Sequence, residues 1–150
     1  MRVTDQRQHD LAQCTRAWQT FRLAHQRVVR RLGTRLTDEC GLAINEFDVL
    51  LHLRSHPNDE VRISALLEVV ALSQPALSRL VTRLETRGLL VRAGAEGDGR
   101  AIQVRLTDTG RALIDRAVEV HARVVQETLI SKFSDKEQAA LLNTLSQIGQ

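Results

Sequence analysis

Aromatic residues are scarce in this sequence: tyrosine is absent, and aromatics make up 3% of the 150 residues. A chain of this length fits one domain and buries about 70% of its unfolded surface without help from metals or disulfides. Its core therefore has to be built mainly from Leu, Val, Ala and Ile. This composition favours helices over a β-sandwich.

Other absences exclude whole classes of protein. The two cysteines, Cys14 and Cys40, are too few for a disulfide framework and match no metal-binding spacing. No signal peptide is visible and no apolar run approaches the roughly 20 residues of a membrane span, so we expect a cytoplasmic protein. There is also no nucleophile elbow, phosphate loop or carboxylate pair, so we expect neither an enzyme nor a bound cofactor.

Charge is distributed unevenly along the chain. Residues 1–35 carry eight Arg against two acids, and residues 73–105 carry six Arg against three acids. Between them, residues 36–72 carry seven acids against two Arg. Two basic blocks around an acidic one predict a localised positive surface.

A long helix is predicted from residue 5 to about residue 38. Its apolar positions recur at alternating spacings of three and four, which is a heptad seam of about three heptads. The seam consists of Leu11, Cys14, Trp18, Phe21, His25, Val28 and Leu32. Such a stripe needs another long helix or a second subunit to cover it.

The remaining elements are shorter and are separated by turn signals. Ser64 and Ser73 are candidate N-caps, Pro75 suits a first helical turn, and Gly88 ends a helix. The capping-box sequence SDKE opens the last helix. The predicted order is helices at 45–54, 64–71 and 73–88, strands at 89–92 and 100–106, and helices at 107–131 and 134–148.

The helix predicted at 73–88 has two unlike faces. The apolar face consists of Leu77, Leu80, Val81 and Leu84. The opposite face carries Pro75, Ser78, Arg79, Thr82 and Thr86, with Arg83 on its flank and no acid. Small Ser and Thr side chains permit close approach to another surface, and Arg suits phosphate or a guanine edge.

Two capped helices followed by a basic hairpin indicate a helix-turn-helix with a wing. The wing would bear Arg92, Arg100 and Arg105. The plainer alternative is a helical hairpin with an ordinary basic exterior. The absence of acids on the outer face and the basic hairpin beside it favour DNA binding.

The segments GLAINEFDVLLHL, LSQPALSRLVTRLETRGLLVR and GDGRAIQVRLTDTGRALID resemble the MarR family of bacterial transcriptional regulators. The resemblance implies a mainly α protein with a small β-hairpin: a winged helix-turn-helix with long dimerisation helices at both termini. Residues 1–40 and 107–150 would form the dimerisation region, and residues 41–106 the DNA-binding region. The implied function is that of a homodimeric regulator, expected to be a repressor, on a palindromic operator.

The resemblance places the recognition helix in the major groove and the wing in the minor groove. Gln74, Ser78 and Arg79 are expected at base edges, and the helix start at Ser73 is expected at a phosphate. Arg83 is expected to contact the DNA backbone or to pair with a nearby acid. The full predicted set is Ser73, Gln74, Pro75, Ser78, Arg79, Thr82, Arg83, Arg92, Asp98 and Arg100.

Two positions depart from the family pattern. Gly99 stands where the wing tip commonly carries a second basic residue, which weakens the expected contribution of the wing. Ala71 stands where a Gly often makes the turn of the helix-turn-helix. If that position is left-handed, the Ala costs about 1 kcal/mol.

Regulation in this family works through a small ligand that is often aromatic and acidic. The predicted pocket lies between the dimerisation helices and the winged helix. Its candidate residues are Trp18, Phe21, His25, Phe47 and Leu51, for which ordinary core packing is the simpler explanation.

Three alternatives remain open. Thiol sensing is disfavoured because the reactive-Cys position of peroxide-sensing relatives falls near Arg22, and Cys14 is expected to be buried on the seam with Cys40 more exposed. Metal sensing would rest on His52 and His56, which lack a third ligand at a suitable spacing. The last alternative is a winged helix that binds a protein partner instead of DNA.

Overall fold

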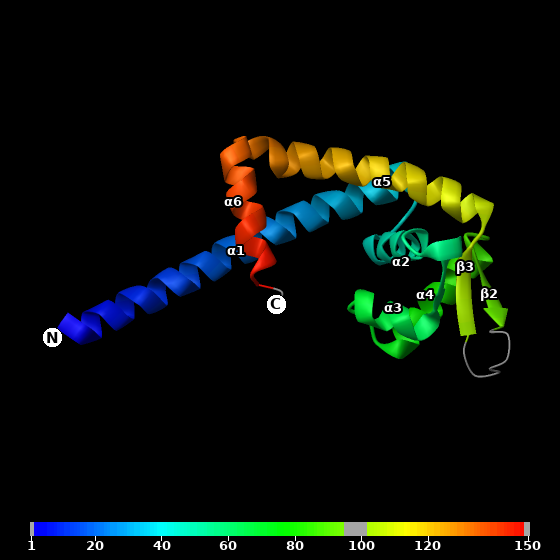
Figure 1. The fold of residues 1–150 in the computed structure, drawn as a ribbon, viewed down its shortest axis with the longest axis horizontal. Helices are drawn as coiled ribbons and strands as arrows, with labels where there is room; N and C mark the ends of the chain where they lie inside the picture. Colours follow the sequence, from blue (N-terminus) through cyan, green and yellow to red (C-terminus); the bar gives the residue numbers. More distant parts are fainter. Residues whose placement is uncertain (1, 95–101, 149–150) are drawn as a thin grey trace. The chain divides into compact units, whose positions relative to one another are not determined.

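The structure is a computed structural model that describes residues 2–94 and 102–148, with side chains from residue 10 onward. Asp98 and Arg100 therefore lie outside the described residues. The helices are α1 (Arg2–Cys40), α2 (Ile44–Arg54), α3 (Ile63–Val69), α4 (Gln74–Thr86), α5 (Asp108–Thr128) and α6 (Asp135–Ser146) (Figure 1). The strands are β1 (Glu60–Arg62), β2 (Leu90–Gly94) and β3 (Ile102–Leu106), and the 3-10 turns are η1 (Pro57–Asp59) and η2 (Ile130–Lys132).

The chain divides into two compact units. We call Met1–Leu32 with Val125–Gln150 the helical unit, and Gly33–Val124 the winged unit. The predicted fold class, mainly helical with a small antiparallel sheet and long terminal helices, is confirmed. The predicted functional regions, 1–40 with 107–150 and 41–106, stay a prediction.

The core of the winged unit is aliphatic, as the composition predicts. The largest fully buried side chains include one aromatic residue, Phe47. The others are Leu36, Leu42, Val49, Leu50, Leu53, Leu66, Leu77, Leu80, Leu84, Leu90 and Ile114. Apart from Leu42, which lies between α1 and α2, these residues come from α1, α2, α3, α4, α5 and β2, so the core joins the helix-turn-helix to the hairpin.

The sheet has three antiparallel strands in the order β1-β3-β2. The predicted hairpin is present, with Leu90 opposite Leu106 and Arg92 opposite Val104. The third strand, β1, was not predicted; it adds to the other edge of β3 with Val61 opposite Val104. Three residues are too short a segment to show a period-2 pattern, so the sequence gives no signal for β1.

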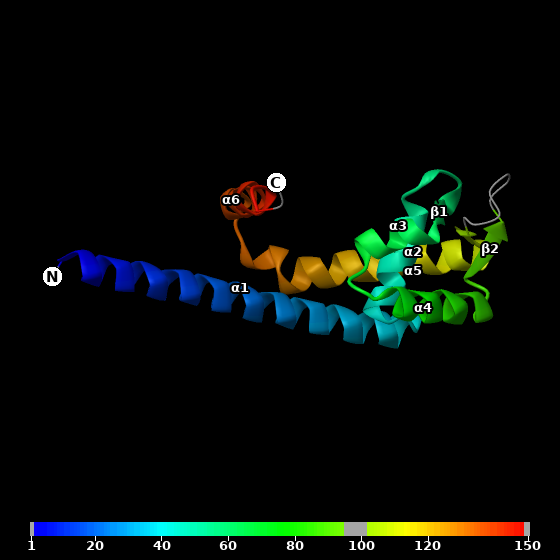
Figure 2. The same cartoon turned by 90° about the horizontal axis from the view of Figure 1, so that it is seen from below.

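The helix-turn-helix runs from α3 to α4, and both helices contact elements of the winged unit: α3 contacts α2, and α4 contacts β2 (Figure 2). Ser73 is the N-cap residue of α4 and Pro75 lies in its first turn, as predicted. The prediction that Ser64 caps α3 is wrong. Arg62 is the N-cap residue, because β1 leads directly into a helix that begins at Ile63.

Backbone conformation accounts for the helix ends. Gly41 and Gly88 have φ of 64° and 69°, which is the left-handed conformation expected after a helix C-terminus. Among the described non-glycine residues, positive φ occurs at Asn58 and Asp59. Ala71 is therefore not left-handed, and the strain considered for it does not arise.

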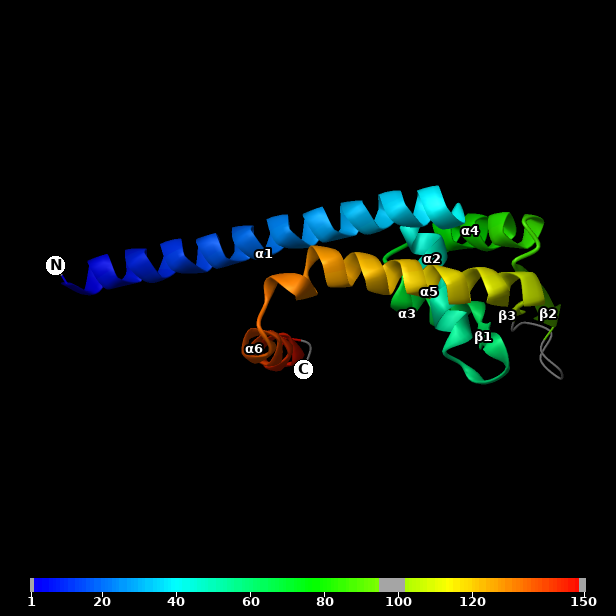
Figure 3. The same ribbon diagram turned by 90° about the horizontal axis from the view of Figure 1, so that it is seen from above.

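In the helical unit, α1 is an uninterrupted helix (Figure 3), and part of its seam is open to solvent. Leu11 and Trp18 are 68% and 62% exposed, whereas Leu32 is buried. The capping box predicted for α6 is present: the backbone N–H and the hydroxyl of Ser134 both donate to the Glu137 carboxylate at 2.8 Å. These hydrogen bonds, led by the backbone donor, lower the pKa of Glu137.

The prediction for the two cysteines is reversed by the structure. Cys14 is exposed and Cys40 is buried. Cys40 lies at the end of α1, where that helix joins the core of the winged unit beside Leu36 and Leu42. Cys14 lies on the part of the seam that is exposed among the described residues.

Among the described residues, no single helix is both long and apolar enough to cross a membrane, although α3 and α4, taken together as one bent pair, meet the length and composition criteria.

Candidate nucleic-acid interface

The recognition helix candidate, α4, has the two faces predicted for it. Its inward side chains are all buried: Leu77, Leu80, Val81 and Leu84. Ser78, Arg79, Thr82 and Thr86 are exposed. The hydroxyls of Thr82 and Thr86 each donate to the carbonyl four residues earlier, on α4 itself. The outer face of α4 is therefore polar and exposed, and its Ser and Thr side chains are short.

The three arginines spaced four apart on this helix have different surroundings. Arg79 is exposed and, within the described ranges, has no ion-pair partner. Arg83 donates from Nε to Oε1 of Glu46 at 2.8 Å, and Arg87 donates from Nη1 to Oε2 of Glu46 at 3.1 Å. Of the two roles predicted for Arg83, the structure shows the pairing with an acid.

Glu46 comes from the first turn of α2 and is almost completely enclosed, with its side chain 6% exposed. Besides the two arginines, its Oε2 accepts a hydrogen bond from the backbone N–H of Ala43 at 3.0 Å. Arg87 also donates from Nη2 to the carbonyl of Gly41 at 3.0 Å. These contacts tie α4 to the start of α2 and to the end of α1. The sequence signal was the Glu three residues after the N-cap Ala43, which alone does not indicate α4 as its partner.

The base of the wing is also tied to α4. Arg92 on β2 forms an ion pair with Glu85, and its Nη2 donates to the hydroxyl of Thr82 at 2.9 Å. The backbone N–H of Arg92 donates to Glu85 as well, at 3.3 Å. Arg92 was predicted to contact DNA; the structure places it in a bridge between hairpin and helix, with part of its side chain exposed.

The first turn of α4 is open and carries no acid. Ser73, Gln74 and Pro75 are all exposed there. Backbone N–H groups at the start of a helix attract anions, so this end of α4 suits a phosphate.

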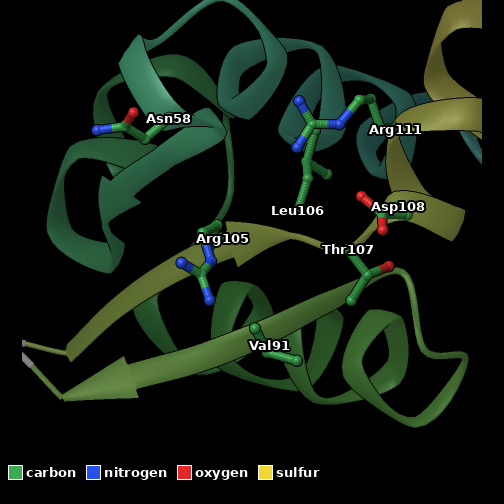
Figure 4. Close-up of a pocket in the computed structure, with 7 residues that line it drawn as sticks. All are labelled: Asn58, Val91, Arg105, Leu106, Thr107, Asp108 and Arg111. Carbon is green, nitrogen blue, oxygen red and sulfur yellow. The ribbon is translucent and has the colours of Figure 1, made fainter.

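A shallow pocket of about 600 Å³ lies beside the hairpin (Figure 4). Figure 4 shows Arg105 on β3 and Val91 on β2, with Asp108 and Arg111 where the chain enters α5. Arg111 is held by an ion pair with the buried Asp59 at 2.6 Å. Arg105 is exposed, and as a wing residue it belongs to the basic surface that the sequence predicts.

The residues predicted to bind a ligand are of two kinds. Trp18 and Phe21 are exposed in the helical unit, where Phe21 stacks against His25 with ring centroids 6.3 Å apart. In the winged unit, Phe47 is buried and stacks on His121 at 5.1 Å, so it packs in the core. Leu51 was expected to face inward but is 37% exposed.

No cluster of three or more metal-ligating side chains occurs in the part of the chain that the structure describes. His52 and His56 do lie together, with ring centroids 4.2 Å apart. Nδ1 of His56 is 2.7 Å from the carbonyl oxygen of His52, which occupies one of the ring nitrogens that a metal would need.

Comparisons with known proteins agree with this architecture. A family model described as the MarR family matches residues 41–101. The HTH-type transcriptional regulator PecS of Dickeya dadantii is 33% identical over 108 residues, which are 71% of this chain and 64% of that protein. The chain thus matches somewhat less than two thirds of the length of that relative.

Two solved structures are similar over nine tenths of the chain. One is Sco3205, a MarR family transcriptional regulator from Streptomyces coelicolor solved in complex with DNA. Its TM-score is 0.82 and its sequence identity is 21%, and the match covers 85% of its length. The other is BpsR of Bordetella bronchiseptica, whose DNA binding is regulated by 6-hydroxynicotinic acid. Its TM-score is 0.77 and its sequence identity is 25%, and the match covers 99% of its length. In sequence and in fold, the chain is similar to the MarR family of transcriptional regulators, and the match to the family model covers residues 41–101.

Proposed function

We propose that two copies of this chain form a homodimer that binds a palindromic operator and represses transcription until a small ligand releases it. The observation that carries the proposal is the outer face of α4, where Ser78 and Arg79 are exposed without a protein partner among the described residues. The surrounding arginines are instead fixed by Glu46 and Glu85. The exposed face is therefore available to a duplex.

Residue roles follow from the geometry of α4. Arg79 and Ser78 contact base edges in the major groove, with Gln74 as a further contact from the first turn. The helix start at Ser73, together with Pro75 and Thr82, lies against the DNA backbone. Arg83 offers its outer nitrogens to a phosphate. In the wing, Arg92 supports the hairpin, and Asp98 and Arg100 remain the proposed minor-groove residues.

Support for a homodimer comes from apolar side chains that a single chain leaves uncovered. Trp18 is 62% exposed on α1, and Leu142 is 71% exposed on α6. Large apolar side chains exposed in this way are expected where another chain covers them. A two-fold dimer would place two recognition helices one turn of B-DNA apart, roughly 34–36 Å, which is why the operator is expected to be palindromic.

Release by a ligand is proposed because the DNA binding of BpsR, which has a similar fold, is regulated by 6-hydroxynicotinic acid. The ligand must bind the DNA-free and DNA-competent forms with different affinity, since otherwise it shifts nothing. Neither a cofactor nor an enzymatic activity forms part of the proposal, and the protein is expected to act in the cytoplasm, where its DNA partner lies.

The test is selection of duplexes from a random library by the purified protein. We expect enriched sequences with two inverted half-sites whose centres are about 10 base pairs apart. Affinity for the enriched duplex should fall steeply with salt if each subunit neutralises several phosphates. Enrichment of no common sequence would contradict the proposal and favour a winged helix that binds a protein partner.

A further inference from the structure

Glu46 is the feature of the winged unit that DNA binding alone does not explain. One carboxylate, 6% exposed, accepts from Nε of Arg83, Nη1 of Arg87 and the backbone N–H of Ala43. Arg83 belongs to α4 and Arg87 is the C-cap residue of that helix, whereas Glu46 belongs to α2, 37 and 41 residues away in the chain. A buried acid therefore lies directly behind the basic face of the recognition helix.

The two arginines are held in different ways. Arg87 uses one terminal nitrogen for Glu46 and the other for the carbonyl of Gly41, so both prongs of its guanidinium are engaged. Arg83 is held only at Nε, and its side chain remains 55% exposed. Its two terminal nitrogens have no hydrogen-bond partner within the described ranges. Glu46 thus fixes the position of Arg83 while leaving its outer edge accessible.

The charge balance has a direct consequence for DNA binding. Arg83, Arg87 and Glu46 together carry a net charge of +1, whereas the two arginines alone would carry +2. Phosphate attraction supplies most of the sequence-independent affinity, and each neutralised phosphate adds to its salt dependence. The carboxylate of Glu46 acts as an internal counter-ion and lowers that sequence-independent attraction. It does not change the proposed contacts of Arg79 and Ser78 to bases.

We propose that Glu46 is a specificity-determining residue: its carboxylate neutralises part of the charge of Arg83 and Arg87 and thereby suppresses binding to DNA of the wrong sequence. This inference rests on the proposed function. Glu46 acts through the two arginines and is a positioning residue, because it does not itself face the duplex.

A purely structural role can be separated from this one. The hydrogen bond from the backbone N–H of Ala43 to Glu46 is one half of a capping box, since Ala43 has no side-chain oxygen to supply the other half, and Gln serves at this position as well as Glu. Glu46→Gln therefore keeps the shape of the side chain and an acceptor for the N–H of Ala43, but it removes the negative charge and, because an amide nitrogen cannot accept, the acceptor for Nε of Arg83. Glu68→Gln is the matched control, because it removes the same charge from an exposed residue of α3 in the same helix-turn-helix.

The experiment compares wild type, Glu46→Gln and Glu68→Gln on two duplexes between 50 and 200 mM salt. One duplex is the sequence selected by the wild type, and the other is a scrambled version of it. For Glu46→Gln we expect tighter binding to the scrambled duplex, with a salt slope steeper by about 1 per protomer, equivalent to a roughly fourfold larger loss of affinity for each protomer across this range. The ratio of selected to scrambled affinity should fall. Slopes and ratios equal to those of Glu68→Gln would overturn the inference.

A second pair of variants tests the same point without touching Glu46. Arg87→Gln should lower the salt slope on the scrambled duplex by less than Arg79→Gln does, because both prongs of Arg87 are already occupied and Glu46 already neutralises part of its charge, whereas Arg79→Gln should lower the slope by about 1. Equal losses in the two variants would also overturn the inference. Failure of the wild type to enrich any duplex would contradict the proposed function itself, which keeps the two failures distinct.

Discussion

At the scale of single residues, two arginines one helical turn apart illustrate how surroundings decide a role. Arg79 is exposed on the outer face of α4, and Arg83 is bound at Nε by a buried carboxylate. A guanidinium without a protein partner can turn both prongs to one base edge, whereas one fixed at Nε presents only its outer edge. Sequence-reading is therefore assigned to Arg79 and backbone contact to Arg83.

The first prediction follows from this difference. Arg79→Ala should weaken binding to the selected duplex by about 1–3 kcal/mol and relax the sequence preference at the contacted base pair. Fluorescence anisotropy with the selected duplex and single-base variants measures both effects. Arg116→Ala, which removes an exposed arginine from α5, is the matched control and should leave the preference unchanged. An intact preference in Arg79→Ala would contradict the role given to Arg79.

A second prediction at this scale concerns His52. Desolvation by burial, and then the neighbouring His56, lower the pKa of His52 from its ordinary value of 6.5. The unfolded state therefore binds a proton more readily than the folded state, so stability should decrease as the pH falls through 6.5 and below. His52→Gln should remove part of that decrease. Chemical unfolding at pH 7.5 and pH 5.5 measures it, and an unchanged difference between the two pH values would show that His52 does not contribute.

At the scale of elements, the start of α5 lies in close contact with the segment that leads into the hairpin. Thr107 donates from its hydroxyl to the carbonyl of Gly88 at 2.6 Å, and the backbone N–H of Gly110 donates to the Thr107 hydroxyl at 3.0 Å. Gly110 is buried in α5, and a Cβ at this position would collide with the carbonyl group of Leu89. The absence of a side chain is what permits this approach.

The third prediction compares two helical glycines. Gly110→Ala should destabilise the protein by roughly 1–3 kcal/mol, because the backbone of Leu89 has to move to admit a methyl group. Gly33→Ala in α1 should instead stabilise it by about 0.5–1 kcal/mol, because nothing lies within 4 Å of the added Cβ and Ala is the better helix former. Urea unfolding of both variants measures the difference, and shifts of the same sign would contradict this account.

The elements also show where local sequence signals suffice. Short sequence segments predict the helix ends and caps, because each of these features depends on contacts within one helical turn. The examples are the helix ends at Gly41 and Gly88, the N-cap Ser73 and the capping box of Ser134 and Glu137. The strand β1 is not readable in this way. It exists because Val61 lies opposite Val104, more than 40 residues later, on an edge that only the folded hairpin provides.

At the scale of the whole molecule, the apolar side chains left open in the helical unit bear on assembly. Trp18 on α1 and Leu142 on α6 are the residues that a second copy is expected to cover. Two-fold symmetry would pair the same surface on both copies, which is the usual arrangement of a homodimer. DNA binding to a palindrome then depends on this contact.

The fourth prediction tests that dependence. Trp18→Glu should dissociate the dimer, because it places a charge in an apolar contact, and should reduce binding to the selected duplex at least tenfold through loss of the second half-site. Gln19→Glu adds the same charge at the next, exposed position and should leave both properties intact. Sedimentation equilibrium gives the mass of each variant. A wild-type protein that is monomeric at micromolar concentration would contradict the proposed assembly.

The sequence by itself determined the local features of this protein. Heptad and helical periodicity, caps and glycine stops predicted the helices, and the two faces of α4 predicted an exposed surface of Ser, Thr and Arg, since each signal lies within a few residues of its effect. Tertiary structure decided the rest: that Glu46 occupies Arg83 and Arg87, that Arg92 is bound to Glu85, and that Cys40 is buried while Cys14 is exposed. These outcomes depend on which distant segments of the chain meet. The electrostatic energy of a charged side chain is set by its neighbours in space, and no local sequence pattern encodes which residues those neighbours are.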